Sequence, residues 1–408
     1  MNKGWQIKKL GEVCDFQNGF AFKSKTYKEN GLPILRITNI QNDIIDTNEL
    51  VYFDKNDYKE NLDRFRVIRD DLLIAMSGAT TGKLGVNKSD TIFYLNQRVG
   101  KFIPKKQLNK NFLYYFLSTK VEESLRIAAG AAQPNLSTEQ INNFEIPLPP
   151  LPEQHRIVSI LDQCFSAIDK AKANAEQNLI NAKELFESYL QVVFENGNWK
   201  KKKLSDVAKH SLGKMLDKNK NKGEPQEYLR NLNVRWFDFD LSNLNKMLFL
   251  ESENEKYTAI KGDVLICEGG YPGRAAIWEE DYPIFFQKAI HRVRFHKQEY
   301  NRWFLYFLFI LDKTGKLKNH FTGTGIQHFT GDALGRLLVP IPPLNKIEII
   351  VRQLDALRTE TQKLETIYQK KIDNFAELKK SILGKAFAGE LTEKQINNRK
   401  MITFAKLK

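Results

Sequence analysis

The sequence of 408 residues predicts an α+β fold, built from two pseudo-repeated α/β-mixed domains that are separated by two long antiparallel coiled-coil helices. Three observations lead to this prediction. The segment at residues 146–162 returns at residues 339–355. A long helical pattern follows each copy, and short β-type runs with turn signals precede it. An internal repeat of this length indicates that a whole unit was duplicated.

The repeat extends well beyond this segment. IPLPPLPEQHRIVSILD at residues 146–162 corresponds to VPIPPLNKIEIIVRQLD at residues 339–355. At nearly the same spacing, Trp5, Leu10, Val13, Leu35, Arg36 and Asn39 match Trp199, Leu204, Val207, Leu229, Arg230 and Asn233. Whatever one half of the chain does is therefore expected twice.

Charge points to a polyanionic partner. The chain has 63 Lys and Arg against 49 Asp and Glu, a net charge of +14, which favours nucleic acid through phosphate contacts and counterion release. A basic protein without such a partner stays an open alternative, because lysine runs such as residues 200–203 are commonly solvated surface.

Several classes of protein are excluded. No segment approaches the roughly 18–20 apolar residues of a membrane span, and the N-terminus lacks the apolar core of a signal peptide. Cys14, Cys164 and Cys267 form neither a disulfide framework nor a CxxC metal pair. We therefore expect a protein of the reducing cytoplasm.

The element order follows from the same patterns. β-type runs are expected at residues 32–40, 67–76, 91–95 and 98–104, and again at 264–268, 275–278 and 290–295. One amphipathic helix follows in each half, at 110–128 and 300–315, and then a small-residue loop, at 130–138 and 323–331. The predicted division is 1–150 (first domain), 151–197 (first long helix), 198–343 (second domain), 344–390 (second long helix) and 391–408 (C-terminal tail).

The long helices carry apolar stripes whose steps alternate between four and three residues. A helix of about 44 residues is roughly 65 Å long, too long for one small domain to bury, so each helix is expected to pack on its twin. The alternative, in which each stripe packs on its own domain, stays open. The predicted packing residues are Ile157, Leu161, Ile168, Leu179, Phe186, Ile350, Leu354, Leu357, Leu364, Ile372 and Phe375.

The chain contains no recognisable motif for catalysis. GATTGK at residues 78–83 has three residues between its glycines instead of the four of a phosphate loop, and Leu84 replaces the magnesium-binding hydroxyl. Together with GGYPGR at residues 269–274, it is interpreted as a strand-connecting turn that ends in a cation. No base-methylating Asn-Pro-Pro segment, cofactor loop, helicase signature or HExxH pattern occurs, so we expect no catalytic residue and no metal.

The residues together resemble the specificity subunit of a type I restriction-modification system. The resemblance rests on the paired halves, on LPPLPEQHRIV at residues 148–158 before a long helix, and on DLLIAMSGATTGKLGV at residues 71–86. It covers essentially the whole chain. The second copy departs from the pattern at residues 345–347, where Asn-Lys-Ile replaces the Pro-Glu-Gln of residues 152–154, which leaves the contacts at that helix start open.

The resemblance implies two target-recognition domains that each read one half of a split, asymmetric sequence in double-stranded DNA, with the helices setting the spacing. It also implies a subunit without catalysis of its own. Two modification subunits, which methylate adenine with S-adenosylmethionine, would dock on the helices, and restriction subunits that hydrolyse ATP with Mg would join them. No cofactor is then expected on this chain.

Candidate DNA contacts are polar residues at matched positions. A position that both halves share fits folding or phosphate contact, whereas base readout is expected where the halves differ, as at Thr80 and Tyr271. A structural role stays open for each. The candidates are Arg36, Asn39, Ser77, Thr80, Thr81, Lys83, Asn96 and Gln97 in the first half, and Arg230, Asn233, Arg235, Tyr271, Arg274, Gln287 and Lys288 in the second.

Three other functions remain as alternatives. A stand-alone two-site DNA-binding protein would need no helix surface for partners. A coiled-coil scaffold without DNA function would show no salt-dependent binding to a duplex. A nuclease would cleave DNA alone with magnesium, but no motif in the chain indicates one.

Overall fold

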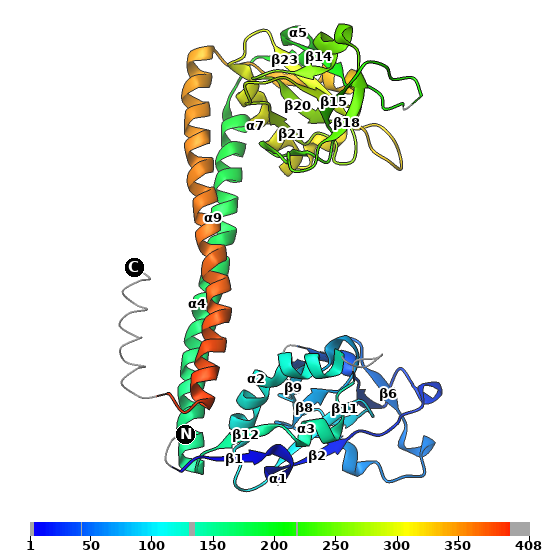
Figure 1. Ribbon diagram of the computed structural model, residues 1–408, viewed down its shortest axis with the longest axis vertical. Coiled ribbons are helices and arrows are strands. Elements are labelled where there is room, and N and C mark those ends of the chain that lie inside the picture. The colour runs from blue at the N-terminus through cyan, green and yellow to red at the C-terminus, as the bar shows by residue number, and fades with distance from the viewer. Residues whose placement is uncertain (1–3, 42, 130–134, 218, 392–408) are drawn as a thin grey trace. The chain divides into compact units, whose positions relative to one another are not determined.

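The computed structural model describes residues 4–41, 43–129, 135–217 and 219–391. The chain divides into two compact units, the first formed by residues up to 174 and from 371 onward, the second by residues 175–370. Each unit holds one mixed domain together with one end of both long helices (Figure 1).

The domain of the first unit has two four-stranded sheets, with strand orders β2-β11-β8-β9 and β6-β3-β10-β7. Two small pairs, β1 with β12 and β4 with β5, complete it. The strands are β1 (Gln6–Lys9), β2 (Cys14–Asn18), β3 (Leu32–Leu35), β4 (Ile40–Gln41), β5 (Ile44–Ile45), β6 (Val51–Phe53), β7 (Arg66–Val67), β8 (Leu72–Ala75), β9 (Leu84–Val86), β10 (Phe93–Leu95), β11 (Val99–Pro104) and β12 (Glu145–Leu148). The helices are α1 (Leu10–Val13), α2 (Lys110–Ala129) and α3 (Thr138–Asn142).

The domain of the second unit repeats this topology, with sheets β14-β23-β20-β21 and β18-β15-β22-β19 and the small pairs β13 with β24 and β16 with β17. The strands are β13 (Lys201–Lys203), β14 (Ala208–Leu212), β15 (Glu224–Leu229), β16 (Val234–Arg235), β17 (Asp238–Phe239), β18 (Asn245–Phe249), β19 (Thr258–Ala259), β20 (Val264–Cys267), β21 (Ala275–Ile277), β22 (Ile284–Phe286), β23 (Ile290–Phe295) and β24 (Leu338–Pro340). The helices are α5 (Leu204–Val207), α6 (Asn254–Tyr257), α7 (Tyr300–Lys313) and α8 (Gly331–Arg336).

One central strand in each domain belongs to two cores at once. Leu72 and Ile74 of β8 pack in a core with α2, whereas Leu73 and Ala75 pack against the second sheet. Because successive side chains of a strand point to opposite faces, a strand covered on both faces must be apolar throughout. The strand β20, with sequence VLIC, is shared between two cores in the same way.

The helices α4 (Leu151–Asn196) and α9 (Leu344–Phe387) run antiparallel within each unit (Figure 1). In the first unit, Asp169 of α4 forms an ion pair with Lys379 of α9 at 2.5 Å. In the second unit, the Tyr189 hydroxyl of α4 donates to Gln353 Oε1 of α9 at 3.3 Å. The predicted α+β class with paired long helices is confirmed. Among the described residues, no helix is long and apolar enough to cross a membrane.

The predicted packing residues of these helices differ in burial. On α9, Leu364 is 37% exposed, whereas Thr361, one step earlier on the same stripe, is 2% exposed. Ala175 and Ala182 are buried and allow close approach of the helices. Ile157, Leu161, Ile168, Phe186 and Leu354 are buried, whereas Leu179, Ile350, Leu357, Ile372 and Phe375 are partly buried.

Three hydrogen bonds of one glutamine fix the start of α4. Gln154 is fully buried, its Oε1 accepts from the Asn109 amide at 2.8 Å, and its Nε2 donates to the carbonyls of Gln107 and Pro149 at 2.9 Å each. In α9 the equivalent residue is Ile347, which is also buried. The second helix start is therefore held by apolar packing in place of these hydrogen bonds.

The predicted helices α2 and α7 are confirmed, and each predicted β-type run contains a strand. The runs at residues 32–40 and 67–76 are strands only in part, and several other strands were not predicted. The strand β15 has the sequence EPQEYL and exposes its first four residues. It shows no apolar alternation, and proline is rare in strands, so its sequence carries no strand signal. The strands β2 (CDFQN) and β14 (AKHSL) are also rich in polar residues, whereas β18 (NKMLF), which pairs with β15, ends in three apolar residues.

We predict that Gly82→Ala lowers the free energy of unfolding by about 1–3 kcal/mol. Gly82 has φ +81°, and an added Cβ would lie 2.8 Å from Ser124 Cβ, so both the backbone and the packing oppose the change. Gly384→Ala is the control, because its Cβ would meet nothing within 4 Å, and in an α-helix the change should stabilise by about 0.5–1 kcal/mol. Urea unfolding of both variants measures the difference, and equal effects would contradict the prediction.

Candidate nucleic-acid interface

Three segments that are far apart in sequence meet in each domain. In the first, the Thr80 hydroxyl donates to the Ile37 carbonyl at 3.1 Å, and the Asn96 amide donates to the Leu35 carbonyl at 3.1 Å. In the second, the equivalent bonds run from Arg274 Nη2 to the Asn231 carbonyl at 3.0 Å and from the Gln287 amide to the Leu229 carbonyl at 3.1 Å. The segments around the candidate residues therefore form one site per domain.

The matched arginine and asparagine organise a turn. Asn39 is 2% exposed, its Oδ1 accepts from the Arg36 amide at 3.0 Å, and its Nδ2 donates to the Asp46 carbonyl at 3.0 Å. Arg36 Nη2 donates to the Glu49 carbonyl at 2.9 Å. Because these groups are used inside the fold, the placement of Asn39 favours a folding role over contact with DNA.

The second domain repeats this turn with the same bonds. Asn233 is 4% exposed, accepts from the Arg230 amide at 2.9 Å and donates to the Asp240 carbonyl at 2.8 Å. Arg230 Nη2 donates to the Asn243 carbonyl at 3.0 Å. The positions that both halves share therefore maintain the same loop in both domains.

The loop at residues 77–83 connects β8 to β9, as predicted, and turns its hydroxyls inward. Ser77, Thr80 and Thr81 are buried, and Thr81 donates to the Gly78 carbonyl at 2.7 Å. Lys83 is partly buried and donates to Gln41 Oε1 at 3.1 Å. At this loop only residues 78 and 79 are exposed to a ligand.

The equivalent loop of the second domain, residues 268–274, is different on its surface. Tyr271 is 45% exposed, and its hydroxyl donates to Asp312 Oδ2 at 3.2 Å. The Arg274 guanidinium lies over the Tyr271 ring at 5.1 Å. The halves thus differ at Thr80 and Tyr271, where base readout is expected: the second loop exposes an aromatic ring, whereas Thr80 of the first loop is buried.

Exposed polar side chains at the third segment also differ between the halves. Gln97 and Arg98 are exposed in the first domain, and Lys288 is exposed in the second, whereas Asn96 and Gln287 are partly buried. Arg98 and Lys288 form no ion pair with any residue that the structure describes. Such cations are available for phosphate contacts. Arg235, also exposed, is instead paired with Asp240 at 3.4 Å.

A loop without an assigned contact residue lies beside this site. Residues 322–328 close through two backbone hydrogen bonds between Thr322 and His328, of 2.8 and 2.9 Å, and Ile326 within the loop is 77% exposed. The Phe329 amide donates to the Glu268 carbonyl at 2.8 Å, which holds the loop next to residues 268–274. In the sequence, the feature that could have pointed to this loop is the single isoleucine, Ile326, among glycines and threonines. Of the matching loop at 130–138, residues 130–134 lie outside the described residues.

The reactive side chain types have structural roles here. Burial raises the pKa of the Cys14 thiol to about 12 and that of Cys267 to about 11, so neither is a nucleophile near neutral pH. Burial lowers the pKa of His291 to about 4, and its Nε2 bonds to the Phe329 carbonyl at 2.9 Å. Within the described ranges, no group of three His, Cys, Asp or Glu side chains could hold a metal ion.

Comparison with known families gives one match for each half. A family model described as the type I restriction modification DNA specificity domain matches residues 2–179 and again residues 196–374. The specificity subunit of the type I restriction enzyme EcoKI from Escherichia coli is 24% identical over 96% of this chain and 90% of its own length. That of MjaVIII from Methanocaldococcus jannaschii is 33% identical over 42% of each chain.

Solved structures share the fold. A chain from a structure on the assembly and conformational transition of a type I R-M system superposes with a TM-score of 0.72 at 19% identity, over 96% of this chain and 99% of that one. The HsdS subunit from Thermoanaerobacter tengcongensis superposes with a TM-score of 0.61 at 19% identity, over 96% and 98%.

We predict that Asn39→Ala and Asn233→Ala each lower the free energy of unfolding by about 1–3 kcal/mol, since each change leaves buried backbone groups unpaired. Lys288→Ala should change stability by less than about 0.5 kcal/mol. It should instead weaken duplex binding and reduce the slope of log affinity against log salt by about 1. Thermal unfolding and duplex titration at several salt concentrations separate the two effects. Unchanged stability in both asparagine variants would contradict the folding role.

Proposed function

This chain belongs to the family of type I restriction-modification DNA specificity subunits, and from that membership we propose that its two domains read the two halves of an asymmetric, bipartite target in double-stranded DNA. The observation that carries the proposal is the duplicated site, with the same buried turn in both copies and different exposed groups. Because the buried turn is the same in both domains, both would bind the duplex in the same orientation. The exposed groups differ between the domains and would therefore contact different bases.

The long helices would set the distance between the half-sites. Neither α4 nor α9 is interrupted, with 46 and 44 residues respectively. Their antiparallel pairing resists bending, and half-sites on a duplex must be met at a fixed number of base pairs. Two uninterrupted, paired helices between two similar domains support a protein that recognises two half-sites over a coiled-coil scaffold without DNA function.

The helices also offer a surface for partner subunits. In the second unit, α4 and α9 are joined by the hydrogen bond between Tyr189 and Gln353, and exposed apolar side chains lie on both helices. Leu185 and Val192 of α4 are 51% and 52% exposed, and Ile349 of α9 is 56% exposed. An apolar face on a pair of helices is suited to packing further helices against it.

We propose that two modification subunits dock along these helices, one at each unit, and that restriction subunits join the complex. The chain itself would be non-catalytic and would bind no cofactor, with S-adenosylmethionine, ATP and Mg held by the partners. A relative is named as the specificity subunit of a type I restriction enzyme, and this supports a cytoplasmic location for the proposed complex.

Methylome sequencing tests the proposal directly. A strain that expresses this chain with its modification subunit should gain adenine methylation at one bipartite, asymmetric sequence, and a strain that lacks the chain should not. A palindromic or continuous methylated sequence would contradict two different half-sites. No new methylation, with both subunits present and bound to each other, would contradict the function as a whole.

We predict that removing one heptad from each helix shortens the preferred spacing between half-sites by about three base pairs. Seven residues correspond to about 10 Å of helix, and one base pair to about 3.4 Å. Residues 171–177 and 368–374 both lie between the Asp169–Lys379 ion pair and the Tyr189–Gln353 hydrogen bond, so the stripes stay in register. The shift is measured on duplexes of graded spacing. An unchanged spacing preference in a folded double deletion would exclude a spacer role for the helices.

We further predict that Val192→Asp weakens binding of a modification subunit by at least about tenfold, because it introduces a charge into the apolar face. Gln177→Asp is the control, at an exposed polar position of the same helix. Copurification and titration with the modification subunit measure the effect. Since both side chains are exposed, unfolding temperatures should be unchanged, and equal binding by both variants would place the docking surface elsewhere.

A further inference from the structure

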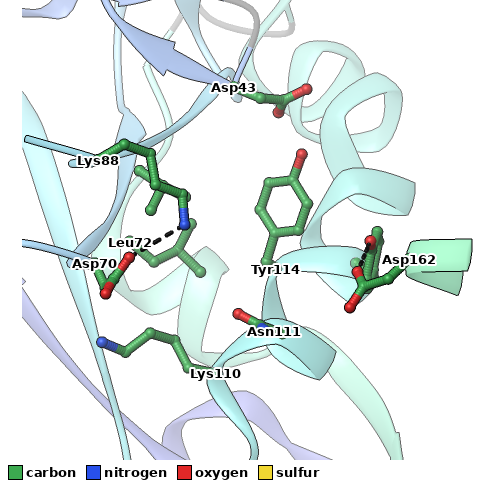
Figure 2. A pocket seen from close by; sticks show the side chains of 10 residues that line it. Asp43, Asp70, Leu72, Lys88, Lys110, Asn111, Tyr114 and Asp162 are labelled. Atoms are coloured by element: carbon green, nitrogen blue, oxygen red, sulfur yellow. Dashed lines mark hydrogen bonds and ion pairs between the residues drawn. The ribbon is translucent and has the colours of Figure 1, made fainter. Parts of the chain in front are cut away.

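The domain of the first unit contains a cavity of about 510 Å³ beside the start of its long helix (Figure 2). Side chains from the β4–β5 hairpin, from β8 and β9, and from α2 and α4 line it. Three carboxylates, those of Asp43, Asp70 and Asp162, border the cavity, and the Tyr114 hydroxyl points toward Asp43.

The second domain shows what occupies the same place in the duplicate. Phe237 is the counterpart of Asp43, since both have left-handed φ angles, of +66° and +70°. Both also donate their amide to the first residue of the neighbouring strand, Phe237 to the Ala275 carbonyl at 3.1 Å and Asp43 to the Leu84 carbonyl at 3.2 Å. The two hairpins can therefore be compared residue by residue.

In the second domain the place is filled by one aromatic ring and two guanidinium groups. The Phe237 ring packs on Tyr306 with centroids 5.4 Å apart, and the Arg358 guanidinium lies over Phe237 at 4.1 Å. Arg302 pairs with Asp355 of α9 at 3.7 Å and with Glu279 at 3.0 Å. The carboxylate of Asp355 thus has both a phenol and a guanidinium as partners.

The first domain has the equivalent carboxylate, Asp162, but has no arginine at the positions of Arg302 and Arg358. Asp162 corresponds to Asp355 and accepts from the Tyr115 hydroxyl at 2.5 Å. The repeat places Asn111 where the second domain has Arg302, and Phe165 where it has Arg358. No lysine or arginine among the described residues forms an ion pair with Asp162.

The nearby lysines do not replace those arginines. Lys88 is paired with Asp70 at 3.1 Å, and Lys379 is paired with Asp169 at 2.5 Å. Lys110 lies at the opposite end of the cavity from Asp43 (Figure 2). Burial raises the pKa of Tyr114, and the charge of Asp43 raises it further, so the phenol stays protonated and offers its ring and hydroxyl to a ligand.

We propose that this cavity binds an arginine side chain of a partner protein, with the guanidinium facing Asp43 and Asp162 and its stem against Tyr114. A guanidinium is weakly hydrated, pairs with carboxylates through several N–H groups and packs on aromatic rings, and these are the interactions that Arg302 and Arg358 make in the second domain. The first unit would thus obtain from a partner what the second unit carries in its own sequence.

The identity of the partner rests on the proposed function, whereas arginine binding itself does not. The natural source is the modification subunit at the first unit. There the positions equivalent to Ile349 and Val192 are Arg156 and Lys385, and only the equivalent of Leu185, Leu378, remains apolar, so most of the apolar face of the second unit is not repeated. A charged anchor would compensate for the missing apolar contact.

Titration of the full chain with argininamide tests the binding step, with lysinamide and glycinamide as matched ligands. The wild-type chain should bind argininamide at least about tenfold more tightly than lysinamide. Asp43→Asn, which preserves shape, should reduce this binding at least about fivefold, and Asp90→Asn, an exposed carboxylate of the same domain, should not. Equal binding of all three ligands, or no effect of Asp43→Asn, would overturn the proposal.

A graft of the second domain's residues gives an independent test. Asp43→Phe with Asn111→Arg and Phe165→Arg should fill the cavity, raise the unfolding temperature and abolish argininamide binding. With the modification subunit, this variant should retain one bound copy where the wild-type chain retains two. If it instead loses duplex affinity and keeps both copies, the cavity is a DNA contact and the proposal fails. If argininamide binds but methylome sequencing finds no target, the proposed function fails and the arginine site stands.

Discussion

The hydrogen bond between a phenol and a carboxylate at the base of each domain is the interaction on which the rest of the structure depends. Tyr115 of α2 donates to Asp162 of α4, and Tyr306 of α7 donates to Asp355 of α9. Burial first, and then the neighbouring carboxylate, raise the pKa of both phenols, so the donor proton is kept. The helices α2 and α7, which supply the phenols, also pack in a core with one face of the central two-sided strand of their domain. The orientation of the domain on the long helix is therefore fixed from inside the core, as a protein that meets a duplex at two places requires.

The duplication separates residues that maintain the fold from residues that differ in function. Asn39 and Asn233 are buried and make the same bonds, while the exposed positions beside them hold glutamine and arginine in one half and lysine in the other. A buried polar group without its partner costs free energy in either half, so such positions cannot vary independently. Exposed positions carry no such cost. The halves can thus diverge in what they read without losing the loops that present the reading residues.

Much of this architecture could be predicted from the sequence, because apolar periodicity reports burial. The strands β8 and β20 are apolar throughout, and α4 and α9 carry stripes over more than forty residues, so their positions were predictable. The strand β15 was not, because its first four residues are exposed and pair through backbone groups alone. Candidate contacts were harder still. A matched polar residue such as Arg36 looks the same in sequence whether its guanidinium faces a phosphate or the Glu49 carbonyl, and only the fold distinguishes the two.

The same comparison shows why the two units are not interchangeable. Phe237 and Asp43 occupy equivalent backbone positions with left-handed φ angles. Their surroundings differ, aromatic around Phe237 and polar around Asp43. Phe237 completes an aromatic cluster with Tyr306 and Phe309, which closes the space over α7 and α9. Asp43 leaves that space open and charged. The second unit has the apolar helix face and a filled cavity. The first unit has an open cavity, and two of the three residues of that helix face are replaced by Arg156 and Lys385. Each unit therefore offers one distinct means of attachment. Partners that dock at both ends would then be bound by different forces, apolar burial at one and charge pairing at the other, and salt would affect the two attachments unequally.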